Sequence, residues 1–575
     1  MITKMTRYSF ILLSGEKDAF LSRLQESGVM DITRSTKPVD EHSHALIDEA
    51  NAIKAEISNI RKGTDAHLTE LVAEEASLRR HAAELAPWGD YDKAALEAFG
   101  VKYYCVPSKK YDPSWEEQYA IQKACEQDGK TWFVLVGDAS GFPCKEIPAP
   151  DSTQSELLSQ AEEKKLEVEN YRNSLEARKS ELPKLEARIG EIYTELNAYL
   201  AGITAETAAE DRIVVFEGFA PSEEDSRLAA EFDSMDIYWT SEPAKAEDQP
   251  PIKLRNNWFA RQFESLTGMY GMPVYDEWDP TPILAPFFLL FFALCMGDAG
   301  YGIVLLALAY AFKGMKNGGP MGLGNHWRLL RSLGIATIVV GFFLGTFFGI
   351  DLSQASWVPD SLKGVMLKGT VAGFDVQMVL AIAVGVFHLC LAMIVKSILY
   401  TQRFGFKNTI SSWGWTLLIV GSLVTVGMSA ALTLPTQTTK IIIIGIAVVS
   451  VLGIFIFNKI GRNPLLNVGA GLWDTYQVVT GLLGDVLSYI RLYALGLAGG
   501  MLGGAFNTLG EMILGPNPTW QFVPCILVLL LGHVLNFAMS CLGAYVHPLR
   551  LTFVEYFKNS GYEGTGRKFN PLQKI

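Results

Sequence analysis

Long apolar segments dominate the second half of the chain and constrain its fold more than any other feature. A helix rises about 1.5 Å per residue, so roughly 20 apolar residues cross the 30 Å hydrocarbon core of a bilayer. From residue 281 to residue 575 we therefore predict an α-helical membrane domain. Its eight predicted transmembrane helices lie at about 283–296, 299–312, 328–350, 376–399, 411–433, 439–458, 474–511 and 521–556. The last two are long, and we expect them to be strongly tilted.

Charge divides the chain at the same place. Of its 575 residues, 49% are hydrophobic and 19% are charged, which indicates a membrane protein with a large aqueous part. Residues 281–575 contain 18 Lys and Arg against 9 Asp and Glu, a net charge of +9, whereas the preceding residues contain 31 against 52, a net charge of −21. The acidity of the first part argues against nucleic acid and anionic lipid as its partners.

The first part shows no signature of an enzyme. Its first 18 residues lack the apolar core of a signal peptide, so we expect residues 1–280 to be cytoplasmic. The seven cysteines have no paired spacing, which suits a reducing compartment, and no GxxxxGK[ST] phosphate loop is present. We therefore expect no catalytic residue, no metal site and no cofactor on this chain.

Residues 1–280 are predicted to form cytoplasmic α/β lobes joined by two long helical tracts, at about 41–86 and 155–200. Strands are expected where short apolar or β-branched runs occur. These runs are residues 8–13, 102–106, 132–136, 213–216 and 237–240.

Heptad spacing in both tracts predicts a coiled coil. The seam of the second tract consists of Val168, Leu175, Leu182, Ile189 and Leu196 with Tyr171, Leu185, Ile192 and Tyr199, interrupted by Arg178 and with a kink expected at Pro183. The first tract offers Ala50, Ile57, Leu71, Leu78 and Leu85, with a break at Thr64. The two tracts can pair antiparallel as a rod between the lobes. The alternative is two amphipathic helices packed on a domain core.

Basic residues indicate the orientation of the membrane domain. With eight passes and a cytoplasmic start, the loops after passes two, four and six face the cytoplasm. Nine basic residues fall in those loops and three in the opposite ones, the asymmetry of the positive-inside rule. The nine are Lys313, Lys316, Arg328, Arg331, Lys396, Arg403, Lys407, Lys459 and Arg462, and the three are Lys363, Lys368 and Lys440. Both termini are then cytoplasmic.

Arg491 is the most unusual residue of the membrane domain. It lies in the apolar stretch 482–502, whose other charge is Asp485, and is too far from either end of its helix to reach water. A guanidinium at that depth costs roughly 2.5–3.5 kcal/mol on insertion scales, so another group must offset the cost. A carboxylate is the natural partner.

Small and polar residues form one stripe on each of the last two helices. Because a lipid-facing polar stripe is costly, both stripes should face protein or water. The alternative is close helix packing through small residues, which explains the glycines but not a central arginine. The seventh helix carries Gln477, Gly481, Gly484, Ser488 and Arg491, and the eighth carries Gly532, Asn536, Ser540, Gly543, His547 and Arg550. Arg550 is nearer the helix end, where it can snorkel or pair with Glu555.

Several segments resemble a known family. SYIRLYALGLA (488–498) and VHPLRLTFVEYF (546–557) are similar to the two signature segments of subunit a, or subunit I, of vacuolar/archaeal-type rotary ATPases. Supporting segments are PFFLLFFALCMGDAGYG (286–302), GVFHL (385–389), YGMPVYDEWDPTP (270–282) and EGTGRKFNPL (563–572). In EGFAP (217–221), Phe219 replaces a tryptophan that the family often has.

The resemblance implies a stator subunit in a prokaryotic plasma membrane. Its partners would be the proteolipid ring subunits, the peripheral stalk subunits and the rest of the complex, within the lipid bilayer and without nucleic acid. Arg491 and Arg550 would face the ion-binding carboxylate of the ring. Candidate half-channel residues are Gln477, Asp485, Ser488, Asn536, Ser540, His547 and Glu555, with Asp298 and His388 as weaker candidates.

The resemblance leaves some positions open. Relatives in the eukaryotic branch carry carboxylates where this chain has Gln477 and Ser540, and Asp485 and His547 are the nearest titratable substitutes. The ion is either H+ or Na+, because the ion-binding carboxylate would belong to the ring. Two other readings are an autonomous multi-pass transporter, with Arg491 as a substrate counter-ion, and a coiled-coil membrane tether.

Overall fold

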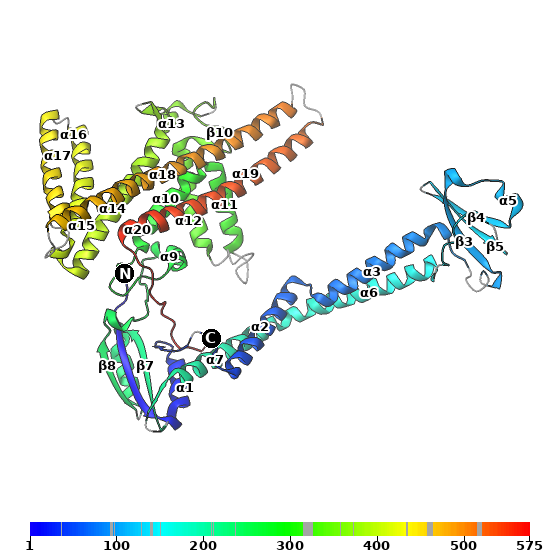
Figure 1. Ribbon diagram of the computed structural model, residues 1–575, viewed down its shortest axis with the longest axis horizontal. Helices are drawn as coiled ribbons and strands as arrows, with labels where there is room; N and C mark the ends of the chain where they lie inside the picture. The colour runs from blue at the N-terminus through cyan, green and yellow to red at the C-terminus, as the bar shows by residue number, and fades with distance from the viewer. Residues whose placement is uncertain are drawn as a thin grey trace. The chain divides into compact units, whose positions relative to one another are not determined.

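The computed structural model describes residues 1–574 except 36, 92–95, 97, 128, 138–141, 150, 209, 211, 236, 314–325, 357, 372, 433–434, 457–463 and 515–519. The chain divides into two compact units (Figure 1). One comprises Met1–Phe10 and Glu217–Pro571, and the other comprises Ile11–Phe216 and Leu572–Ile575. The boundary passes through strands β1 (Met5–Leu13) and β7 (Ile213–Pro221).

The larger sheet contains these two strands at its centre. Its order is β2-β7-β1-β8, with β6 beside β7, where β2 is Asp31–Ile32, β6 is Glu206–Ala208 and β8 is Tyr238–Pro243. Alternate residues of β1 are buried, and Tyr8 and Phe10 contact Phe232 of helix α8 (Asp225–Asp233) edge to face. The alternation expected of a strand with one buried face therefore fixes the core of this sheet.

A second, antiparallel sheet has the order β3-β5-β4, with β3 at Val101–Pro107, β4 at Ile121–Gln127 and β5 at Lys130–Val136. The five sequence-predicted strands coincide with β1, β3, β5, β7 and β8. Strand β4 was missed because it is a mostly polar, exposed edge strand that pairs only with β5. An edge strand buries too little for its sequence to alternate clearly.

Four long helices of the second unit form two pairs, α3 (Ala66–Leu85) with α6 (Gln154–Ala177) and α2 (Glu41–Lys62) with α7 (Leu182–Thr204) (Figure 1). Ion pairs across the helices show that the pairs are antiparallel, because partner numbers fall as residue numbers rise. These ion pairs are Glu49 with Arg188, Glu56 with Arg178 and Glu74 with Lys164.

Apolar seams lie inside both pairs. The seam of α3 and α6 contains Leu68, Leu71, Val168, Tyr171 and Leu175, and the seam of α2 and α7 contains Leu46, Ala50, Ile192, Leu196 and Leu200. The expected kink at Pro183 is a short break: α6 ends at Ala177, a 3-10 turn covers Arg178–Glu181, and Pro183 lies in the first turn of α7. Proline is tolerated there because its missing N–H would have no partner within the helix.

Six described helical segments are long and apolar enough to cross a membrane, at Trp327–Leu344, Val376–Phe404, Phe406–Ser429, Thr436–Ile456, Leu466–Leu514 and Phe522–Ser560. Two shorter apolar helices precede them, α10 (Thr281–Met296) and α11 (Ala299–Lys313). The six correspond to α12 (Trp327–Leu344), α14 (Val376–Phe404), α15–α16 (Ile410–Leu432), α17 (Thr436–Val451), α18 (Pro464–Leu514) and α19 (Phe522–Arg550). The basic loop residues Lys316, Lys459 and Arg462 lie outside the described residues.

Helix α12 ends earlier than its sequence predicts, at Leu344 instead of 350. Gly345 adopts a left-handed conformation, with φ of +69°, which stops the helix. The apolar residues that follow belong to a small hairpin, β9 (Thr346–Phe347) with β10 (Ile350–Asp351). An apolar run alone does not distinguish a continued helix from such a hairpin.

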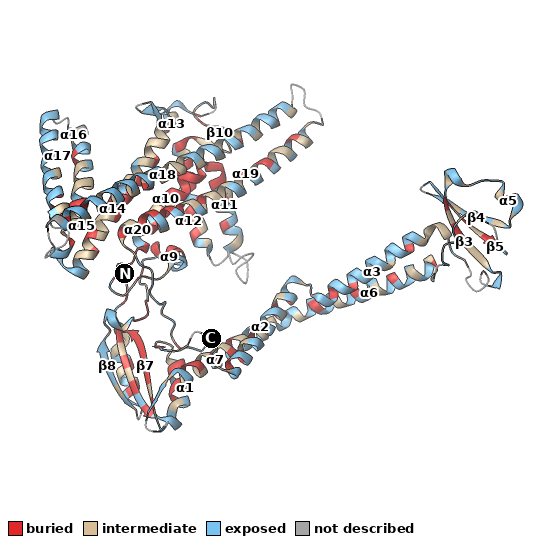
Figure 2. Cartoon of the chain, in the orientation of Figure 1, coloured by how far each residue is buried: buried red, intermediate tan, exposed pale blue. Residues whose placement is uncertain are grey.

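Helix α10 lies at the centre of the helical bundle. Ten of its 16 residues are buried, and it packs against α12, α18 and α19 (Figure 2). By contrast, many apolar side chains of α18 and α19 remain exposed in the described chain. A helix that is apolar on all sides is buried, and α10 accordingly lies inside the bundle. With 16 residues it is shorter than the six longer segments.

Replacing Asp65 with alanine should loosen the start of α3. The Asp65 carboxylate accepts hydrogen bonds from Leu68 N (2.8 Å) and from the Tyr171 hydroxyl of α6 (2.6 Å), and these bonds lower its pKa. Losing this N-cap costs about 1 kcal/mol. Hydrogen exchange of the amides in the first two turns of α3 should accelerate roughly fivefold.

Asp48→Ala is the matched control, because Asp48 is exposed in the middle of α2 and should leave exchange unchanged. The stabilisation by Asp65 is present above the usual pKa of a carboxyl group and is lost as pH falls through its lowered value. Equal exchange in both variants would contradict the capping role.

Candidate functional site

Helices α18 and α19 pack closely because glycines of each face the other. A Cβ added to Gly532 of α19 would lie 2.4 Å from the ring of Phe506, and one added to Gly499 of α18 would lie 3.1 Å from Ser540 Oγ. Small residues let two helix backbones approach. The packing interpretation of the predicted stripes therefore holds for Gly532, whereas a Cβ added to Gly484 would meet no atom within 4 Å.

Arg491 lies half-buried on α18, on a face that the described chain leaves open. Leu487, Ala494 and Ala498 share this face at helical spacing, and all three are exposed. Arg491 forms no ion pair or hydrogen bond with any described residue. Its neighbours include Cys295 of α10 and His547 of α19, with which its charge interacts. The guanidinium is thus without a carboxylate within the described part of this chain.

Arg550 occupies a similar position on α19. It is exposed and continues an open apolar stripe formed by Leu535, Met539, Leu542 and Val546. Across the described ranges it forms no ion pair with Glu555, although the two charges are close enough to interact. The open faces of α18 and α19 therefore each carry one arginine.

Charged and polar side chains gather on one side of Arg491. We call this group, formed by Asp485, Ser488, Glu555, Lys558 and Asn559, the Asp485 cluster. Asn559 donates a hydrogen bond to Asp485 Oδ2 (2.7 Å), and Lys558 Nζ lies 3.7 Å from Asp485 Oδ1. Glu555 is 2% exposed, interacts with Ser488, and its Oε2 has no hydrogen-bond partner in the described structure.

A wider helical turn orients Glu555. Residues Leu551–Tyr556 form a π-helical turn in which Leu551, Thr552, Glu555 and Tyr556 are all buried. Such π-turns often occur at functional sites because they redirect side chains that a regular helix would place elsewhere. Here the turn places a carboxylate inside the bundle beside α18.

Neutral polar side chains gather on the other side of Arg491. We call this group, formed by Tyr301, Asn507, His533, Asn536 and Ser540, the Asn536 cluster. Asn536 donates to Gly499 O and to the Tyr301 hydroxyl, both at 2.8 Å. His533 joins Tyr301 (2.9 Å) to Asn507 (3.0 Å), and Ser540 Oγ donates to Asn536 Oδ1 (3.4 Å).

The two clusters lie on opposite sides of Arg491 along α18. Asp485 precedes Arg491 by six residues, about 9 Å along the helix, and Gly499, which Asn536 contacts, follows it by eight residues, about 12 Å. Helix α19 runs antiparallel to α18. Glu555, which follows His547 in sequence, therefore lies on the side of Asp485, and Asn536, which precedes His547, lies on the side of Gly499. Polar groups therefore lie on both sides of the two arginines.

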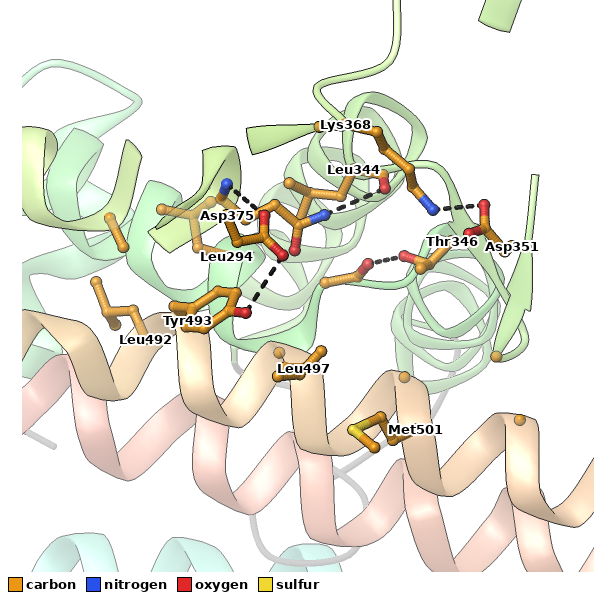
Figure 3. A pocket seen from close by; sticks show the side chains of 18 residues that line it. Leu294, Leu344, Thr346, Asp351, Lys368, Asp375, Leu492, Tyr493, Leu497 and Met501 are labelled. Atoms are coloured by element: carbon orange, nitrogen blue, oxygen red, sulfur yellow. Dashed lines mark hydrogen bonds and ion pairs between the residues drawn. The ribbon is translucent and has the colours of Figure 1, made fainter. Parts of the chain in front are cut away.

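A cavity of about 450 Å³ opens beside the second half of α18 (Figure 3). Tyr493 donates from its hydroxyl to Asp375 Oδ2 (3.3 Å), and Lys368 pairs with Asp351. Burial alone would raise the pKa of Asp351, but hydrogen bonds from Lys368 and Ser353 lower it below its usual value. The cavity also reaches Gly496, Gly500 and Gly504 of α18. An ion pair and a carboxylate thus line a space large enough for several water molecules, next to the helix that carries Arg491.

Comparison with known proteins identifies the family. The V-type ATPase 116kDa subunit family matches residues 121–322. A-type ATP synthase subunit I of Methanocaldococcus jannaschii is 31% identical over 75% of this chain and 66% of its own length, and that of Pyrococcus horikoshii is 33% identical over 58% and 49%. V-type ATP synthase subunit I 1 of Treponema pallidum is 25% identical over the full length of both chains. This chain belongs to the subunit I family.

Most predicted site residues of this subunit I family member fall into the two clusters. Asp485, Ser488 and Glu555 lie in the first, Asn536 and Ser540 lie in the second, and His547 lies between them, next to the arginines. Gln477 does not join either cluster. Its side chain is exposed and has no hydrogen-bond partner in the described ranges.

Asp298 and His388 have structural surroundings. The buried Asp298 carboxylate accepts hydrogen bonds from four backbone N–H groups, those of Gly300, Tyr301, Phe348 and Gly349. It therefore ties the α10–α11 turn to the hairpin of β9 and β10. His388 is fully buried between the rings of Phe287 and Tyr556 and bonds to the Tyr489 hydroxyl (3.0 Å). Of the described residues, none forms a group of ligands able to hold a metal ion.

Sequence reasoning missed Tyr301, Asn507, His533, Asp375 and Tyr493. His533 was the strongest available signal, since it lies three residues before Asn536 on the same helix face. Tyr301 lies within GDAGYG, whose glycines predict a turn but give no signal that the tyrosine hydroxyl binds a distant helix. Asp375 comes from a loop distant in sequence, and no local pattern links it to Tyr493.

Replacing Asp298 with asparagine should destabilise the α10–α11 turn. The amide keeps one acceptor but presents N–H₂ to a backbone donor that the carboxylate now satisfies. Leaving that buried donor unpaired costs about 1–3 kcal/mol. Thermal unfolding in detergent should shift to lower temperature, and amides of residues 346–351 should exchange faster.

Asp360→Asn is the control, because the Asp360 side chain is 99% exposed. It should leave the unfolding temperature unchanged. An unaltered unfolding temperature in Asp298→Asn would show that the four hydrogen bonds contribute little.

Proposed function

We propose that this chain is the stator subunit of a rotary V/A-type ATPase or ATP synthase that couples ion translocation to the rotation of a proteolipid ring. The observation that supports this proposal is the open face of α18, where Arg491 has no carboxylate partner among the described residues. A permanent charge at that depth is costly unless another molecule supplies an acid. A ring of subunits with acidic groups would supply one repeatedly.

The chemistry follows from the electrostatics of a carboxylate. In lipid, a ring carboxylate must be neutral, protonated or ion-occupied, because desolvation disfavours its charged form. Beside Arg491 and Arg550 the charged form is favoured, so the carboxylate releases its ion there. Arginine suits this role because it stays charged where a buried lysine can lose its proton.

The two polar clusters provide separate access paths. The Asp485 cluster would carry ions between one side of the membrane and the ring, and the Asn536 cluster with the Asp375 cavity would carry them between the ring and the other side. Arg491 lies between the two paths, so its positive charge opposes direct passage of a cation. An ion must therefore travel with the ring, and each charge crossing is coupled to about 2.3 kcal/mol per 100 mV.

The clusters also suggest how this chain works without acidic residues at Gln477 and Ser540. On the first path, Asp485 and Glu555 are two carboxylates near each other. On the second, Asn536 and Ser540 are neutral, and Asp375 is the carboxylate beside α18. These groups would allow passage of either H+ or Na+, and the ring carboxylate would determine which ion is transported.

The helix pairs of the soluble part fit a mechanical role. A stator must resist the torque of the ring, and paired antiparallel helices with internal apolar seams and cross-helix ion pairs form a stiff element. We propose that this coiled-coil rod and the α/β lobes hold the peripheral stalks. With eight passes, residues 1–280 and the C-terminal tail would lie in the cytoplasm of a prokaryotic cell, beneath its plasma membrane.

Replacing Arg491 with glutamine should abolish ATP-driven ion pumping by the assembled complex. Without the fixed charge, the ring carboxylate has no reason to release its ion beside α18. We expect pumping in reconstituted vesicles to fall at least a hundredfold, while the subunit composition of the purified complex stays unchanged.

Lys440→Gln serves as the control, since it removes one exposed positive charge from the same membrane region. It should retain normal pumping. Normal pumping by Arg491→Gln would refute the proposed mechanism, and transport by the isolated chain would favour an autonomous transporter.

Variants of the two paths should respond to pH on different sides of the membrane. Glu555→Gln should alter the dependence of pumping on pH at the ATP-exposed side, and Asp375→Asn should alter its dependence on pH at the opposite side. Each removes a titratable group from one path. Pumping rates in vesicles with inner and outer pH set independently measure both effects.

Ser540→Ala provides a comparison, because it changes the second path without removing a titratable group. It should slow pumping without moving either pH profile. A shift on the same side for Glu555→Gln and Asp375→Asn would contradict two separate paths.

A further inference from the structure

We propose that a basic cavity at the beginning of α12 binds the phosphate headgroup of an anionic lipid. The cavity measures about 1530 Å³ and lies between residues 252–272, the first turns of α12 and the segment 566–569. Five basic side chains line it, those of Lys253, Arg261, Arg328, Arg331 and Lys568. The comparisons and the proposed mechanism assign no role to these residues.

The positive charge of this cavity is largely uncompensated. None of its five basic side chains forms an ion pair with a described carboxylate. Among the described lining residues, Glu264 alone is acidic, and its carboxylate accepts a hydrogen bond from Asn256 (3.0 Å). Although residues 1–280 are acidic as a whole, basic residues from both halves of the chain gather here. An anion bound among these side chains would relieve the repulsion between their like charges.

Aromatic residues place the cavity at the level of lipid headgroups. Trp327 begins α12, a helix long and apolar enough to span the bilayer, so the cavity lies at the end of a span. Arg328 and Arg331 lie 5.7 Å and 5.3 Å from the Trp327 ring centre, and Trp258 in the cavity wall is 70% exposed. Tryptophan is enriched at membrane interfaces, and basic pockets at that level bind anionic headgroups.

The exposed apolar lining favours a lipid over free phosphate. Trp258 and Met269, which is 59% exposed, offer an apolar surface next to the guanidinium groups. A lipid satisfies both, because its headgroup pairs with the arginines while its acyl chains cover the apolar surface. Inorganic phosphate would satisfy only the charges. The inference requires α12 to span the bilayer, but not the proposed ion translocation.

The test is lipid binding by the full chain, purified in detergent and freed of lipid. Native mass spectrometry with phosphatidylglycerol and with phosphatidylcholine measures the affinity for each lipid. The triple variant Arg261→Gln/Arg328→Gln/Arg331→Gln should bind phosphatidylglycerol at least tenfold more weakly, since each basic side chain contributes about fivefold near a membrane surface. Phosphatidylcholine should bind both proteins equally weakly.

The control variant Lys363→Gln/Lys407→Gln/Lys440→Gln removes the same charge elsewhere in the membrane unit and should change the affinity less than twofold. The single variant Arg328→Gln tests the site with minimal disturbance of folding, because Arg328 is exposed, and should lose roughly threefold to fivefold. Equal losses in both triple variants, equal affinity for both lipids, or displacement of the lipid by inorganic phosphate would overturn the proposal. Because binding is measured on the isolated chain, failure here leaves the pumping experiments unaffected.

Discussion

The unpaired guanidinium of Arg491 is the constraint on which the membrane part depends. A charge in an apolar helix destabilises insertion, and ordinary membrane proteins offset it with an internal acid. Here the described acids that lie nearest, Asp485 and Glu555, are engaged with Asn559, Lys558 and Ser488 instead. The charge is therefore available on an open face, which is useful only if that face meets a partner.

Close packing of α18 and α19 places polar side chains on both sides of Arg491. Gly499 and Gly532 let α18 and α19 approach until polar side chains of α19 reach the backbone of α18. That register brings Asn536 to one side of Arg491 and Glu555 to the other. A bulkier residue at Gly532 would clash with the Phe506 ring and push the two helices apart next to the Asn536 cluster. The small residues and the polar residues of the stripes thus serve one arrangement.

The sequence predicted much of the framework because period and composition are local. Five strands and both helical tracts were found from alternation and heptads, and the apolar segments marked the membrane helices. Sequence-based prediction failed for features that depend on contacts between residues distant in the chain or on the backbone conformation of a single residue. The end of α12 depends on the backbone of Gly345, the edge strand β4 on its single neighbour, and the partnership of Asp375 with Tyr493 on residues 118 positions apart.

The tertiary contacts of two intramembrane residues, Asp298 and His388, bear on their candidacy for ion transfer. From sequence, Asp298 and His388 were weaker candidates for ion transfer than Asp485, but their place in the membrane helices kept them eligible. The structure surrounds Asp298 with four backbone donors and encloses His388 between aromatic rings. Glu555 differs because it lies beside Asp485 and Ser488 of α18. One of its buried oxygens has no hydrogen-bond partner in the described chain, a feature that it shares with His388 Nε2 and His547 Nδ1. A buried acceptor left open in this way is costly, and a passing ion or proton would satisfy it.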